Sequence, residues 1–141
     1  MKRLVLVLMV AALAPAAPAA RAATFTVTSI ADAGDAGTGD GLCATAEARC
    51  TLRAAIQQAN ATLGTDAIGF SLGAGTARIS PGSGLPPVTE AVAIDGGSPG
   101  PLAGTPRIEL SGHAAGSANG LVIAADGASV RGLIVNRWAQ E

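Results

Sequence analysis

The hydrophobic pattern of this chain begins with a short apolar run close to the amino terminus. Lys2 and Arg3 precede an apolar stretch over residues 4–13, and Ala20-Arg21-Ala22 then offers small residues at cleavage positions. A charged, an apolar and a small-residue region in this order are typical of a secretory signal peptide. The apolar run is about half the ~20 residues that a membrane-spanning helix requires. We therefore predict a signal peptide over residues 1–22 and a secreted or cell-surface protein without a membrane span.

The apolar pattern then changes its period near residue 51. Residues 24–30 alternate apolar and polar positions and are rich in β-branched side chains, which predicts a strand, and residues 32–41 follow as a Gly/Asp loop. Thr51 is suited to cap a helix and Gly64 to end it. Between them the apolar side chains fall at helical spacing on one face, namely Leu52, Ala55, Ile56, Ala59 and Leu63.

Beyond residue 67 the apolar positions come in short pulses separated by Gly, Pro, Asp or Asn. Short strands at such intervals fit either a β-sandwich or a parallel solenoid. The segment Gly120–Asn136 holds two apolar runs joined by a turn at Asp126 and ends in an Asn. This pattern favours coils of a right-handed parallel β-helix. The sequence has room for about three coils, the minimum for a stable solenoid, so we expect a truncated, amino-terminal fragment of a longer protein.

The two cysteines of the chain, Cys43 and Cys50, lie just ahead of the predicted helix. In an exported protein such a pair is expected to form a disulfide rather than a metal site. A zinc site would need four ligands, and the single histidine, His113, lies far away in the sequence.

The segment around these cysteines resembles a known family. The run C-T-L-R-A-A-I-Q-Q-A-N from Cys50 to Asn60 follows the strand T-F-T-V-T-S and a Gly/Asp loop that ends in Cys43, and this order resembles the CSLREA domain. The match covers about residues 24–60. The resemblance implies a bacterial, exported or surface-associated protein in which the domain follows a signal peptide and precedes a right-handed parallel β-helix.

Two positions depart from the name-giving run of that family. Thr51 stands where Ser is usual, and Ala54 stands where Glu is usual. Ser-x-x-Glu forms a capping box, so Ala54 should weaken the helix start by about 0.5–1 kcal/mol.

These observations together predict a mainly β fold. Residues 23–64 would form a strand and a short amphipathic helix that cap a pectate-lyase-like parallel β-helix over residues 65–141. The cap would be anchored by the disulfide and would cover strand edges that otherwise invite pairing with other chains. We expect structural roles for four residues of the helix motif, namely Thr51, Leu52, Arg53 and Ile56. Arg53 is expected to pair with an acid of the Asp loop or to bond strand carbonyls.

The chain offers few candidates for catalysis or metal binding. Asp32, Asp35 and Asp40 are either solvated turn residues or calcium ligands, and their spacing matches no EF-hand loop, which favours turns. We therefore expect no cofactor, with calcium as the one candidate. A glycosidase needs two facing carboxylates, but Asp95 and Asp126 precede glycines and indicate turns, and Glu109 is expected on a solvent face.

Charge and aromatic content then narrow the partners. After residue 22 the acidic residues outnumber the arginines by ten to six, and the chain has two Phe, one Trp and no Tyr. This argues against nucleic acid, which needs clustered positive charge and stacking partners. We expect a non-catalytic, adhesin-like surface module that binds a surface glycan or another cell-surface component. The alternative is the amino-terminal part of a secreted polysaccharide lyase or glycoside hydrolase.

Overall fold

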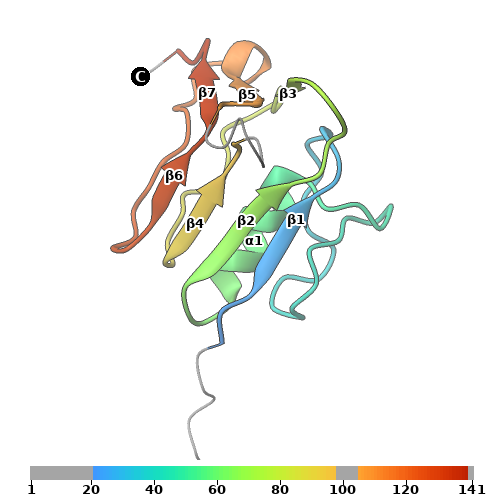
Figure 1. The fold of residues 1–141 in the computed structure, drawn as a ribbon, viewed down its shortest axis with the longest axis vertical. Coiled ribbons are helices and arrows are strands. Elements are labelled where there is room, and N and C mark those ends of the chain that lie inside the picture. Colours follow the sequence, from blue (N-terminus) through green and yellow to red (C-terminus); the bar gives the residue numbers. More distant parts are fainter. Residues whose placement is uncertain (1–20, 98–104, 140–141) are drawn as a thin grey trace, which may run out of the picture.

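The computed structural model describes residues 21–97 and 105–139, so the basic and apolar parts of the predicted signal peptide lie outside the described residues. The described residues form seven strands and one α-helix (Figure 1). The strand predicted over residues 24–30 is present as β1, which is shorter and spans Thr24–Val27, and the predicted helix is confirmed as α1 at Leu52–Ala61. The helix is shorter than its apolar pattern suggested, because it ends before Leu63, whose side chain is exposed.

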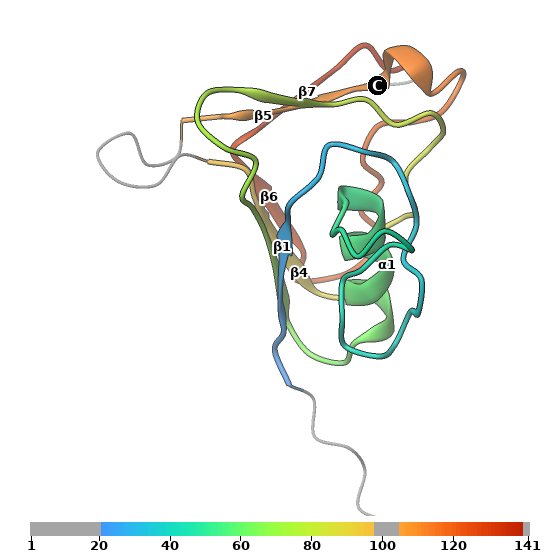
Figure 2. The same cartoon turned by 90° about the vertical axis from the view of Figure 1, so that its right-hand side faces the viewer.

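All strand pairs are parallel and belong to two sheets. The four-stranded sheet has the order β1-β2-β4-β6, with β2 at Asp66–Phe70, β4 at Val92–Asp95 and β6 at Ser129–Arg131. The three-stranded sheet has the order β3-β5-β7, with β3 at Ala77–Ile79, β5 at Ile108–Ser111 and β7 at Leu133–Asn136. Figure 2 shows the two sheets meeting at an angle, with α1 on the inner side of the four-stranded sheet.

The prediction of a right-handed parallel β-helix is wrong. The described chain has two small parallel sheets with one helix, an α/β-like arrangement rather than a stack of parallel rungs. Two of the predicted apolar pulses build no strand, since Val88 and Ile123 meet only in an isolated bridge. The spacing of apolar pulses located most strands correctly, but it carries no information on how strands are shared between sheets.

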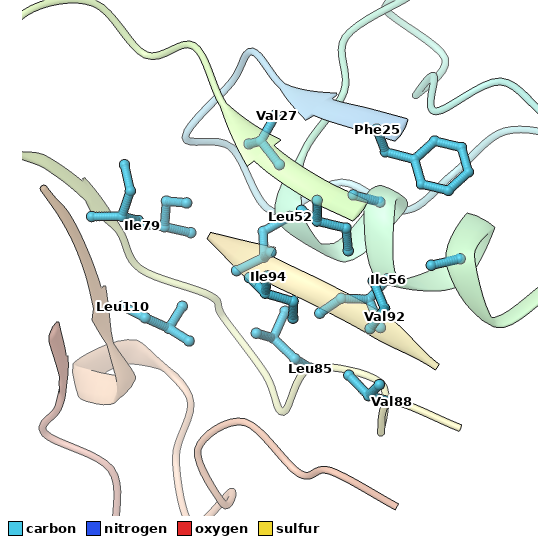
Figure 3. Close-up of a cluster of buried hydrophobic side chains, with 14 of the residues drawn as sticks. Phe25, Val27, Leu52, Ile56, Ile79, Leu85, Val88, Val92, Ile94 and Leu110 are labelled. Carbon is cyan, nitrogen blue, oxygen red and sulfur yellow. The ribbon is translucent and has the colours of Figure 1, made fainter. Parts of the chain in front are cut away.

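The core explains why α1 is part of the fold rather than a lid over its end. Its apolar face packs against β1 and β2, and Leu52 and Ile56 are fully buried there. Side chains of the four-stranded sheet form the opposite wall, in a register that aligns Phe25, Ile68 and Ile94 across three neighbouring strands. Figure 3 shows this cluster, which also takes in Leu85, Val88, Val92, Ile79 and Leu110. Burial of this apolar surface is the main contribution to stability.

The start of α1 is held by a single residue. Thr51 Oγ1 accepts a hydrogen bond from the Ala54 N–H at 3.0 Å and donates one to the Ala33 carbonyl at 2.6 Å. Thr51 therefore acts as the predicted N-cap and also ties the helix to the preceding loop. Ala54 is fully buried, so this position is a packing site in which a Glu side chain would lose its water.

Candidate functional site

The region ahead of α1 is a loop closed by a disulfide and held by polar side chains. Cys43 and Cys50 form the predicted disulfide, with their Cα atoms 5.1 Å apart. The Cys50 carbonyl accepts the N–H groups of Thr28 and Ser29, the two residues that directly follow β1. The disulfide thus fixes the loop on one side to the first strand and on the other to the helix.

Arg53 connects three segments of the chain. Its guanidinium group forms a two-point ion pair with Asp32, through Nε–Oδ1 at 2.8 Å and Nη2–Oδ2 at 3.0 Å. It also donates to the carbonyls of Ser83 and Gly84, while Asp32 accepts the Gly82 N–H at 2.8 Å. The pairing expected for Arg53 therefore has the form of a structural tie between the Asp loop, α1 and residues 82–84.

The other two aspartates of the loop are engaged with its own backbone. Asp35 accepts the N–H groups of Gly37 and Ala44, and Asp40 accepts that of Leu42. These are the local side-chain-to-backbone bonds by which aspartates form turns. In the part of the chain that the structure describes, no three His, Cys, Asp or Glu side chains gather as a metal site would require.

Sequence analysis missed the two residues of α1 that hold this loop in place. Gln57 Oε1 accepts the Asp35 N–H at 2.8 Å, and Gln58 Oε1 accepts the Gly39 N–H at 2.9 Å. Gln58 is a polar residue among the apolar positions of the helix, and it is fully buried. The available signal was this polar residue on the apolar side of an amphipathic helix, because a buried amide requires a hydrogen-bond partner.

Two carboxylates on the strands, Asp95 and Glu109, are engaged in ion pairs. Asp95 accepts the Gly97 N–H and lies 2.8 Å from Arg131, and these two contacts, in that order, lower the pKa of its carboxyl group. Glu109 bonds Arg78 at 2.8 Å and Asn136 at 3.2 Å, which likewise lowers the pKa of Glu109.

Two consequences follow for the candidate acids. Glu109 alternates with the buried Ile108 and Leu110, as expected for the outer face of β5. Arg78 and Asn136 cover its carboxylate there, so its side chain is 13% exposed. A carboxyl group with a lowered pKa is ionised at neutral pH, so neither Asp95 nor Glu109 is suited to be the general acid of a glycosidase. His113 lies exposed in the short 3₁₀ turn Gly112–Ala114.

The aromatic side chains lie inside the molecule. Phe25 is 4% exposed and Trp138 6% exposed, and the Trp138 indole N–H donates to the Leu110 carbonyl. Phe70 is half-buried. Sugar recognition by stacking needs an accessible ring, so the described residues provide little of such a platform.

An open apolar edge at β6 and β7 is the surface feature that stands out. Each of these strands ends its sheet and has one neighbouring strand among the described residues. Three exposed large apolar side chains lie on these strands, namely Val130, Ile134 and Val135. Two more, Val122 and Ile123, precede β6 in the sequence. In Figure 1 the two strands lie on the same side of the molecule. We call β6 and β7 together the open edge.

Gly132 joins the two strands of the open edge. Its φ is +68°, and a Cβ atom there would lie 2.2 Å from the Gly97 nitrogen, so a glycine is required where the chain bends from one sheet into the other. The sequence signal for the edge was the run Leu133–Val135, which is apolar at consecutive positions. Because side chains alternate between the two faces of a strand, this run places apolar side chains on both faces.

Comparisons with known proteins provide no relative for this chain. No family model, curated protein or solved structure matches it. In the described residues no helix is long and apolar enough to cross a membrane.

Proposed function

We propose that this protein is an exported, non-catalytic structural and binding module, adhesin-like in character, whose open edge binds an extended polypeptide strand. The observation that carries the proposal is the open edge itself. An unpaired strand edge accepts a further strand by main-chain hydrogen bonds, and exposed apolar side chains add affinity and register.

The side chains of the open edge are suited to such a partner. Val130 is 40% exposed, Ile134 41% and Val135 46%. Their strands are paired along one edge only, β6 with β4 and β7 with β5. β7 carries no charged residue, and charges are the usual means by which edge strands avoid pairing. β7 therefore lacks the charges that would keep another strand away, whereas β6 carries the exposed Arg131.

A polar atom at the end of β7 supports the same occupant. Asn136 Oδ1 is buried and has no hydrogen-bond partner among the described residues, while its Nδ2 donates to Glu109. Ser111, its register partner on β5, also has a buried hydroxyl without a partner in that part of the chain. An added strand with a donor at this level would satisfy the Asn136 acceptor, since buried polar groups normally find partners.

The remaining features favour a polypeptide over the other ligands. The buried Phe25 and Trp138 offer no stacking surface for a glycan, and the paired carboxylates favour no lyase or hydrolase chemistry. The predicted signal peptide and the disulfide-bearing loop that resembles the CSLREA domain support an exported location, because structural disulfides persist in oxidising compartments.

Binding of a strand peptide tests the proposal. The probe is a fluorescein-labelled peptide that copies residues 129–136, because this segment forms β6 and β7 and a second copy can extend each sheet in the parallel register of its strands. We expect saturable binding by fluorescence anisotropy to the wild-type protein. Ile134→Lys should weaken binding at least about tenfold, since it places a charge in the contact.

Leu42→Lys is the matched control. Leu42 is 65% exposed and lies directly ahead of Cys43 rather than at the edge, so this variant should bind the peptide as the wild type does. Absence of peptide binding to the wild type, or equal binding by Ile134→Lys, would contradict the proposal.

A further inference from the structure

The carboxyl group of Asp66 is half unsatisfied in the interior of the protein. Asp66 begins β2 and is 1% exposed, on the same side of the strand as the core residue Ile68. Its Oδ1 accepts the Ala23 N–H at 2.8 Å, but its Oδ2 is buried and has no hydrogen-bond partner among the described residues. A buried carboxylate with a single neutral donor is costly, and native proteins retain such a group where a partner of opposite charge is available.

The atom next to Asp66 is the nitrogen that signal-peptide removal would change. Ala23 directly follows the predicted cleavage position after Ala22. Its carbonyl accepts the Ala67 N–H at 2.8 Å, so Ala23 is held on both sides, by the backbone of β2 and by the Asp66 side chain. Arg21 and Ala22 are exposed, whereas Ala23 is half-buried. The boundary between exposed and held residues therefore coincides with the predicted cleavage position.

We propose that Asp66 is the binding site for the new amino terminus that cleavage between Ala22 and Ala23 creates. Hydrolysis by a leader peptidase breaks the Ala22–Ala23 peptide bond and adds one water, with the hydroxyl going to the Ala22 carbonyl carbon and a hydrogen to the Ala23 nitrogen. The new amine then takes up a proton from solvent. An amide with one N–H becomes an ammonium group with three, within hydrogen-bond distance of a buried carboxylate.

The charges around Asp66 favour this pairing. Burial raises the pKa of Asp66, the Ala23 N–H opposes this increase, and the nearby negative charge of Glu90 raises the pKa further. A cation at the Ala23 nitrogen would offset both unfavourable effects. The uncleaved chain therefore carries an unpaired buried acid, and the mature chain carries an ion pair at the start of β1 and β2. Removal of the leader would thus stabilise the fold.

The composition of the chain allows a direct measurement of this ion pair. Residues 23–141 contain no lysine, so the α-amino group is the only primary amine in this stretch after cleavage. The protein is exported with its own leader, and its amino terminus is determined by intact mass and terminal peptide sequencing. Acylation of the α-amine is then followed by mass spectrometry as a function of pH. An unperturbed α-amino group has a pKa of about 7.7–8.0.

The expected result is an amino terminus at Ala23 whose amine reacts slowly. At pH 6.5, well below the ordinary α-amino pKa, we expect acylation of the native protein to be about tenfold slower than that of Asp66→Asn, which corresponds to one pKa unit. Asp95→Asn is the matched control, because Asp95 pairs with Arg131 and should leave the rate unchanged. Glu90→Gln reports the contribution of the other nearby acid and should leave the amine protected.

A second variant keeps the test valid if Asp66→Asn fails to fold. One glycine inserted before Ala23, with the leader still removed ahead of it, moves the amine away and leaves Asp66 intact. This extended chain should acylate at the ordinary rate and unfold at a lower temperature than the mature protein. The proposal would be overturned by a mature amino terminus other than Ala23. It would also be overturned by equal acylation rates of the native, glycine-extended and Asp66→Asn proteins.

Discussion

Arg53 differs from the other paired arginines in the surroundings of its guanidinium group. Its side chain is 14% exposed, whereas the side chains of Arg78 and Arg131 are 53% and 77% exposed. Exposed ion pairs are screened by water and contribute little, but a covered, two-point pair with further carbonyl acceptors is a structural element. Of these three arginines, Arg53 is therefore expected to contribute most to stability.

We expect Arg53→Ala to lower the free energy of unfolding by about 2–3 kcal/mol, because Asp32 and two carbonyls lose charged hydrogen bonds. Arg78→Ala, the control, should cost less than about 1 kcal/mol. Urea unfolding monitored by circular dichroism measures both. Arg53→Lys should recover only part of the loss, because an ammonium group cannot make the two-point contact. Equal effects of the two alanine variants would contradict a structural role of Arg53.

Glu109 should make stability depend on pH at the acid side. Its pKa is lowered in the folded protein by Arg78 and then Asn136, so its ionised form stabilises the fold above the ordinary Glu pKa. That contribution is lost as the pH falls from the ordinary Glu pKa through the lowered pKa of the folded protein. Glu109→Gln should therefore show a smaller decrease of Tm between pH 7 and pH 3 than the wild type. An unchanged decrease would show that other acids cause the acid sensitivity.

At the scale of elements, α1 is the part of the fold that depends most on a few side chains. Ile56 is fully buried between the helix and the sheet. Ile56→Asp should therefore cost at least about 4 kcal/mol, through the lost apolar contact and the buried charge, and should lead to aggregation or proteolysis. Leu63→Asp is the control, because Leu63 lies just beyond the helix and is 56% exposed. Limited proteolysis distinguishes them, and a stable, soluble Ile56→Asp protein would contradict the packing of α1.

Ala54 provides a second test at the helix start. The family-like pattern would have Glu here, and the sequence alone suggested that Glu would complete a capping box and stabilise the helix. The structure places Ala54 in the core, fully buried. We therefore expect Ala54→Glu to lower the Tm rather than raise it, because the carboxylate would be moved out of water. Thermal unfolding gives the sign directly, and an increase would support the capping box instead.

The sequence was sufficient for the elements whose signals are local. The N-cap Thr51, the apolar face around Ile56 and the pairing of Cys43 with Cys50 all depend on residues within a few turns of chain. The arrangement of the strands was mispredicted because it depends on distant contacts, such as the register of Ile68 with Ile94. A period of apolar pulses cannot distinguish successive rungs from strands divided between two sheets.

The candidate site was predictable only in part for a related reason. Arg53 was correctly expected to meet an acid of the Asp loop, because both occur in one short motif. The open edge was missed, since exposure of Ile134 or Val135 depends on which strands remain without neighbours. The buried Asp66 was missed as well, because it pairs with Ala23 across 43 positions of sequence.

At the scale of the whole molecule, the disulfide is the one covalent link between distant positions of the described chain. Closing the short loop between Cys43 and Cys50 should contribute about 2.5 kcal/mol by restricting the unfolded chain. Reduction of the disulfide should therefore lower the urea concentration at which half of the protein is unfolded. The measurement compares denaturation with and without reductant, and a Cys43→Ala/Cys50→Ala protein should match the reduced form. Unchanged midpoints would show that the loop is fixed by its hydrogen bonds alone.

In the four-stranded sheet, α1 packs against β1 and β2 at one end, and β6 lies at the opposite end. β7 is the corresponding last strand of the three-stranded sheet. Hydrogen–deuterium exchange of the wild-type protein, with and without the peptide copying residues 129–136, tests this account most directly. We predict slower exchange of amides in β6 and β7 on peptide addition, with no change in α1. Exchange that is unaltered in β6 and β7, or slowed equally throughout the protein, would contradict a strand-accepting edge.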